Sequence, residues 1–149
     1  MTLKELLYQQ CISYTEKRAN TITTTIKSHQ NALSSETKSS AGDKHETGRA
    51  MLQLEMEKAG QQLYTITQMK EILAKIDPSK KNNIAHLGSI ISTNIGNYFL
   101  SISAGILQVH TEQYFAISIS SPIGKLLLGK KVNDDIIFNN KKLQIIAIT

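Results

Sequence analysis

Residues 34–48 read SSETKSSAGDKHETG and form the most polar stretch of this 149-residue chain. On each side of this stretch lies a segment whose seam positions recur at alternating steps of three and four. Such spacing places these positions along one face of a helix, where a second helix can cover them. Two such helices joined by a polar turn predict an antiparallel helical hairpin, packed as a coiled coil.

The two seams are both mostly apolar. The first consists of Ile12, Thr15, Ala19, Ile22, Ile26, His29 and Leu33, and the second of Leu52, Met56, Ala59, Leu63, Ile66, Lys70 and Leu73. The first 41 residues contain neither Gly nor Pro, which favours a long uninterrupted helix. Each arm of roughly 30 residues would be about 45 Å long. Three seam positions are polar, so the true register could differ from this one by one position.

The second half of the chain has a different composition. Pro78 is the first proline, and 14 of the 20 isoleucines follow it. Isoleucine is stiff at χ1 and packs well on pleated surfaces, so this half is expected to form a sheet. We therefore place a boundary at residues 76–82 and predict two domains, residues 1–77 and residues 78–149.

The expected strands are short and separated by turns. They cover residues 89–93, 98–103, 115–120, 135–138 and 143–148, with turns at residues 94–97 and 139–141. Residues 122–128 read as one short helix, with Ser121 as its N-cap, Pro122 as its first residue and Gly129 at its end. One helix on a curled antiparallel sheet makes this half an α+β domain.

Composition excludes several classes of protein. A single cysteine, Cys11, excludes an intramolecular disulfide and a multi-cysteine zinc site. No apolar run approaches the roughly 18 residues that cross a membrane, and the N-terminus lacks the features of a signal peptide. We expect a cytoplasmic protein with no membrane partner. The net charge of +5 is compatible with an acidic or nucleic-acid partner.

The polar turn carries an acidic pair, Asp43 and Glu46, which share a face once the second helix begins. One interpretation is structural: Asp43 caps the helix and Glu46 completes a capping box. The other is functional. Hard cations take about six oxygen ligands, so two carboxylates cannot hold a metal ion alone. They could complete the shell of an ion in another macromolecule's active site, with Lys44 and Arg49 nearby to contact RNA or protein.

Residues 121–132 read SPIGKLLLGKKV. Together with the G-D-x-x-E turn and the break near residues 76–78, this segment resembles the bacterial transcript cleavage factors GreA and GreB. The resemblance covers nearly the whole chain. It implies an FKBP-like C-terminal domain that binds RNA polymerase at the secondary channel through the segment containing Ser121, Pro122, Ile123, Gly124 and Gly129. DNA binding is a further family property.

The resemblance also implies a mechanism. The coiled coil enters the channel, and Asp43 and Glu46 help to hold Mg²⁺ and a water molecule jointly with the polymerase active site. The polymerase then cuts the 3′ end of the backtracked nascent RNA. The factor is thus expected to be a monomeric accessory protein, without enzymatic activity or bound metal of its own.

The residues after the turn depart from the family pattern. The family usually continues E-N-x-E-Y, whereas Glu46 is followed here by Thr47, Gly48 and Arg49. This departure keeps an alternative open, namely a Gre-like secondary-channel regulator that binds polymerase without promoting cleavage, as an inhibitor or initiation modulator. A third possibility, a peptidyl-prolyl isomerase, has only the implied FKBP-like fold in its favour, and fold does not fix function.

Overall fold

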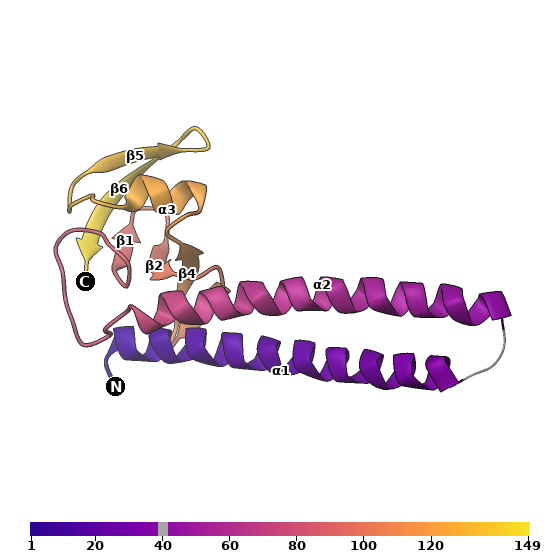
Figure 1. Cartoon of the computed structure of the whole chain (residues 1–149). Coiled ribbons are helices and arrows are strands. Elements are labelled where there is room, and N and C mark those ends of the chain that lie inside the picture. The colour runs from indigo at the N-terminus through magenta and orange to yellow at the C-terminus, as the bar shows by residue number, and fades with distance from the viewer. Residues whose placement is uncertain (39–41) are drawn as a thin grey trace. The chain divides into compact units, whose positions relative to one another are not determined.

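The computed structural model describes residues 1–38 and 42–149, with the side chains of residues 36–38 and 42–45 left undescribed. Two long helices are followed by a six-stranded sheet with one short helix (Figure 1). The predicted α+β class and this order of elements are confirmed. None of the helices in the described ranges combines the length and apolarity that a membrane crossing requires.

The chain divides into two compact units. One unit contains residues 15–69, and the other contains residues 1–14 together with residues 70–149. The ends of the two long helices therefore group with the β-rich part of the chain. The predicted domains, residues 1–77 and 78–149, stay a prediction.

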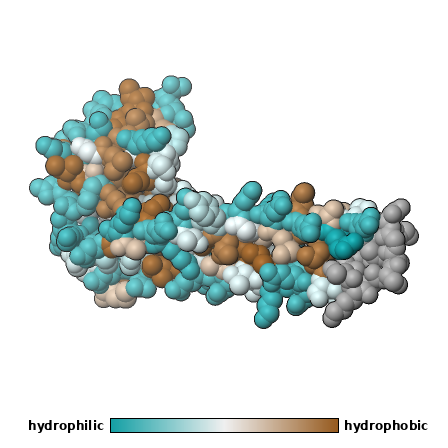
Figure 2. Space-filling model, viewed as in Figure 1, coloured by the Kyte–Doolittle hydropathy of each residue, from teal (hydrophilic) through white to brown (hydrophobic). Residues whose placement is uncertain are grey.

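The first unit is a pair of helices that lie side by side and run in opposite directions (Figure 1). The helix α1 spans Leu3–Lys38 and α2 spans Gly42–Ala74. A cluster of Ile22, Ala59 and Ile66 forms the core between them. Figure 2 shows apolar side chains gathered where the helices meet, between polar outer faces. Residues 39–41, where the predicted turn falls, lie outside the described residues.

The predicted seam of α1 is confirmed, because each of its seven positions is buried or half-buried. The seam of α2 changes at its C-terminal end. Lys70, predicted within the seam, is exposed, and its neighbour Met69 packs against the core of the hairpin instead. Positions three and four residues after the buried Ile66 both lie near its face of the helix. Packing Met69 at this level buries an apolar side chain and lets the ammonium group of Lys70 stay in water.

The sheet of the second unit is mixed, whereas the sequence predicted an antiparallel one. Its order is β3-β4-β2-β1-β6-β5, and β2 pairs with β4 in parallel. The parallel pair is possible because β3, which the sequence did not predict, lies between β2 and β4 in the chain and forms a hairpin with β4. The strands are β1 (Ile90–Thr93), β2 (Asn97–Ser101), β3 (Gly105–Val109), β4 (Glu112–Ser118), β5 (Asp135–Phe138) and β6 (Lys141–Ile148).

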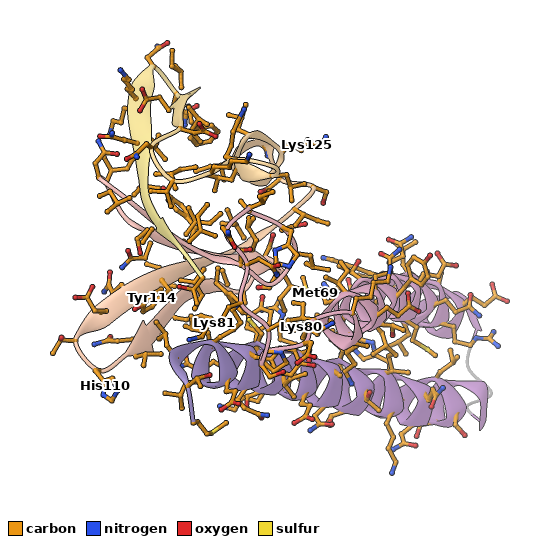
Figure 3. The ribbon with its side chains drawn as sticks, turned by 90° about the vertical axis from the view of Figure 1, so that its left-hand side faces the viewer. Met69, Lys80, Lys81, His110, Tyr114 and Lys125 are labelled. Carbon is orange, nitrogen blue, oxygen red and sulfur yellow. The ribbon has the colours of Figure 1, made fainter. Side chains whose placement is uncertain are left out.

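The turns of the sheet follow the residue types that occupy them. Asn139 and Asn140 both have positive φ, 52° and 63°, which matches the primed turn of a two-residue hairpin between β5 and β6. The β3–β4 turn places His110, with φ 56°, at its tip (Figure 3). The β1–β2 turn has no residue with positive φ. Instead, the Thr93 hydroxyl accepts hydrogen bonds from the N–H groups of Ile95 and Gly96, each at 3.2 Å.

The core of this unit is aliphatic. Ile91, Leu100, Leu127, Leu143 and Ile145 are fully buried in one cluster. The beginning of α1 contributes Leu7 and Cys11, both also fully buried. The Cys11 Sγ atom lies 3.6 Å from Ser101 Oγ at the end of β2. The first turns of α1 are therefore part of the globular core.

Candidate functional site

The acidic pair lies at the beginning of α2. Because α2 begins at Gly42, Asp43 falls inside the first turn and does not occupy the position that precedes a helix, so the capping-box interpretation does not match these bounds. Negative charge in the first turn is favourable, because the N-terminal end of a helix carries partial positive charge. Glu46 follows one turn later and is exposed. The side chains of Asp43 and Lys44 lie outside the described residues.

Arg49 is half-buried next to this pair. Its Nε atom is buried and has no hydrogen-bond partner among the described residues, and the same holds for Nδ1 of the seam residue His29. Glu46 and Arg49 are three residues apart, so they share a face of α2. The helix thus places Arg49, whose Nε atom has no hydrogen-bond partner among the described residues, on the same face as Glu46.

The segment that resembles the polymerase-binding signature forms α3, Pro122–Leu127. Ser121 is its N-cap, and Pro122 occupies the first turn, as predicted. The Ser121 Oγ atom accepts a hydrogen bond from the Gly124 N–H at 3.1 Å and donates one to the Ser118 carbonyl at 2.6 Å. The cap therefore ties the start of α3 to the end of β4.

Gly124 is required by a close approach of the backbone. A Cβ atom at this position would lie 2.1 Å from the Ser118 carbonyl oxygen and 2.9 Å from Ser121 Oγ. Gly129 ends the segment with φ +80°, a left-handed conformation that favours glycine. The sequence identified both glycines, and the structure gives each a separate physical reason.

One face of α3 stays open. Pro122 and Lys125 are exposed, and Leu126 and Leu128 keep 38% and 36% of their surface accessible. On the other face, Leu127 is fully buried and Ile123 packs against the core. An open face that mixes leucine with lysine can bind another protein.

The two groups of residues belong to different compact units, the acidic pair to the hairpin and α3 to the β-rich unit. Within the described residues, no three His, Cys, Asp or Glu side chains come together as a metal site. His110 lies in the turn between β3 and β4, and Glu112 begins β4; neither residue belongs to such a group.

The sequence does not indicate a structural role for Lys4. In the structure Lys4 is 5% exposed and its Nζ atom donates a hydrogen bond to the Lys80 carbonyl at 2.7 Å. Burial lowers the pKa of Lys4 below its ordinary value, while Asp77 opposes this shift. A lysine at an expected helix surface gives no signal of burial, because the segment that covers it follows 76 positions later.

Comparisons with known proteins give only distant similarity. No family model matches the chain, and no curated protein matches its sequence. Among solved structures, the GreA factor homolog 1 (Gfh1) protein of Thermus thermophilus is 17% identical, with 95% of this chain and 94% of that chain covered and a TM-score of 0.35. A second structure, described as the transcription factor Gfh1, is 19% identical, with coverages of 95% and 92% and a TM-score of 0.34.

Proposed function

We propose that this chain is a transcription elongation factor that binds RNA polymerase at the secondary channel and stimulates cleavage of the 3′ end of backtracked nascent RNA. The observation that carries the proposal is the position of Asp43 and Glu46 in the first turns of α2, next to the reversal of a long helical hairpin. The polymerase supplies the catalytic site, and this chain acts as an accessory factor.

The length of the helix supports delivery of the acidic pair into a narrow site. The 33 residues of α2 extend over about 50 Å at 1.5 Å per residue. Glu46 is the fifth residue of α2 and is exposed. An exposed carboxylate at the end of a slender two-helix rod can reach a buried active site that a globular surface cannot enter.

The donor set fits a shared Mg²⁺ ion. Mg²⁺ prefers six oxygen ligands, and Asp43 and Glu46 provide carboxylate oxygens for a minority of them. Polymerase residues, RNA and water would provide the others. When bound, the ion would polarise a phosphoryl oxygen and acidify a water molecule. The contribution of Asp43 and Glu46 is to hold and orient that ion and its water.

The open face of α3 supports docking to polymerase. Ser121 and Gly124 fix the backbone of the segment, so that Pro122 and the half-exposed leucines are presented in one conformation. A preorganised loop and helix lose less conformational entropy on binding than a mobile segment would. We assign polymerase recognition to residues 121–129.

A cleavage assay on stalled elongation complexes tests the proposal. Asp43→Asn and Glu46→Gln keep side-chain size and remove charge, so they should abolish stimulated cleavage while co-purification with RNA polymerase is retained. Glu55→Gln is the matched control, since Glu55 is an exposed carboxylate further along the same helix. Full cleavage by both tip variants would refute the assigned mechanism.

The environment of Arg49 favours a second candidate function, a secondary-channel regulator that binds polymerase without promoting cleavage. A guanidinium group on the same face of α2 as Glu46 would offset part of the negative charge that a metal ion requires. Arg49→Gln separates the two functions. If the chain is an inhibitor, runoff transcription slows in its presence and Arg49→Gln creates or raises cleavage. If it is a cleavage factor, the unmodified chain restarts stalled complexes.

A further inference from the structure

A cavity of about 240 Å³ lies within the β-rich unit, where the start of α1 meets the segment that follows α2. Its lining includes Lys4, Lys75, Asp77, Lys80 and His86, and we call it the lysine pocket. Figure 3 shows Lys80 and the neighbouring Lys81 beside the first turns of α1. None of these residues belongs to the acidic pair or to α3, so the pocket is independent of the proposed function.

The ammonium group of Lys4 is only partly compensated by its surroundings. An ammonium group has three N–H donors, and among the described residues the Lys80 carbonyl is the one acceptor that Nζ reaches. A carbonyl oxygen carries no net charge. Burial disfavours the charged form of Lys4, and an anion in the pocket would reverse that penalty.

Asp77 opposes the effect of burial on the pKa of Lys4 only in part, because its carboxylate is engaged elsewhere. Its Oδ1 atom accepts hydrogen bonds from the Ser79 N–H at 3.0 Å and the Ser79 hydroxyl at 2.6 Å. These bonds hold the pKa of Asp77 below its ordinary value and tie the carboxylate to its own turn. With three lysines and one aspartate in the lining, the pocket keeps two positive charges that the lining does not balance.

His86 forms a fixed wall of the pocket. Its Nε2 atom forms a hydrogen bond with Asn82 Nδ2 at 2.6 Å, and its Nδ1 atom forms one with Ser89 Oγ at 2.6 Å. The positive charge counted for the pocket is that of its lysines.

We propose that the lysine pocket binds a small molecule through a terminal, dianionic phosphate group. Two unbalanced positive charges match the charge of a dianion. The three terminal oxygens of a phosphate group can accept hydrogen bonds from several lysines at once, whereas a carboxylate has only two oxygens. Lysine is a common phosphate ligand in proteins. A water molecule occupies about 30 Å³, so a cavity of about 240 Å³ has room for a diphosphate.

Titration calorimetry on the full chain, in a phosphate-free buffer, tests this inference. Inorganic phosphate, pyrophosphate and ADP are titrated separately, and an RNA oligonucleotide without terminal phosphates serves as the fourth probe. Pyrophosphate should bind with a one-to-one stoichiometry. Tighter binding of ADP than of pyrophosphate would identify a nucleotide, and tighter binding of pyrophosphate would identify the free anion as the ligand.

The variants Lys75→Gln and Lys80→Gln should each weaken pyrophosphate binding roughly tenfold or more, as expected for the loss of a charged hydrogen-bond donor. Both side chains are exposed, so the fold should survive, and Lys80→Gln keeps the carbonyl that holds Lys4. Lys58→Gln, an exposed lysine on α2, is the control and should bind normally. Absence of saturable binding, equal weakening by Lys58→Gln, or equally tight binding of the unphosphorylated RNA would each overturn the proposal.

Discussion

Ser121 and Gly124 form a single structural device at the start of α3. The Gly124 N–H donates to Ser121 Oγ at 3.1 Å, and the space that a Gly124 side chain would need is already occupied by the Ser118 carbonyl. The hydroxyl of Ser121 donates to the same carbonyl. The end of β4 and the start of α3 are thereby fixed together, and with them the segment that we assign to polymerase recognition.

Substitution Ser121→Ala should destabilise the protein by about 1 kcal/mol, the usual cost of losing an N-cap side chain. The Gly124 N–H would lose its acceptor, and the Ser118 carbonyl would lose a donor. Urea unfolding followed by circular dichroism measures the change. Ser121→Asp, which retains an acceptor at the cap, should recover part of the loss. An unchanged midpoint for Ser121→Ala would mean that the cap contributes nothing.

Gly124→Ala should be more damaging, by roughly 2 kcal/mol or more, because backbone must shift to admit the methyl group. Gly60 provides the matched control, since a Cβ atom there meets nothing within 4 Å. Because Gly60 lies inside α2, Gly60→Ala should stabilise the protein by about 1 kcal/mol. Thermal unfolding of both variants tests this contrast. The prediction is wrong if the two substitutions shift the unfolding temperature in the same direction.

The register of the α2 seam can be tested at two adjacent positions. Met69 packs against the core of the hairpin, and Lys70 is exposed. Met69→Ala should therefore cost roughly 1 to 3 kcal/mol, somewhat below a fully buried methionine, while Lys70→Ala should change stability by less than about 0.5 kcal/mol. Chemical denaturation of the two variants measures both changes in stability and so tests the register. A larger loss of stability for Lys70→Ala than for Met69→Ala would instead support the strict seven-residue repeat, with Lys70 in the seam.

The thiol of Cys11 should be unreactive in the folded protein. It is fully buried, and burial raises its pKa, an effect that the contact with Ser101 only partly offsets. Since the thiolate is the reactive form, alkylation at pH 8 should be at least about a hundredfold slower in native buffer than in urea. Mass spectrometry follows the modification. Equal rates in the two conditions would show that the first turns of α1 detach from the β-rich unit.

Lys4 gives stability a pH dependence of known sign. Because burial lowers the pKa of Lys4 in the folded state, the unfolded chain binds more protons at this group between the lowered pKa and 10.5. Stability must therefore rise with pH across that window. Relative to Lys4→Met, the unmodified protein should become progressively more stable from pH 7 towards pH 10 in phosphate-free urea titrations. Lys75→Met, at an exposed position of the same pocket, controls for loss of a lysine.

The features that the sequence predicts well depend on neighbouring residues. The seam of α1, the Ser121 cap with Pro122 after it, and the paired asparagines between β5 and β6 all follow from local periodicity, capping or turn preference. These preferences act within a few residues, so one sequence contains all the information that they need.

The features that the sequence does not predict depend on residues far apart in the chain. The strand β3 went unrecognised, and without it the parallel pairing of β2 with β4 could not be foreseen. The burial of Lys4 depends on a segment 76 positions away, and Gly124 is needed because of the path of β4. The sequence by itself determined the hairpin, the capped helix and the acidic pair. Only tertiary structure decided which strands pair and which charges are buried, because these depend on what surrounds each residue once the chain has packed.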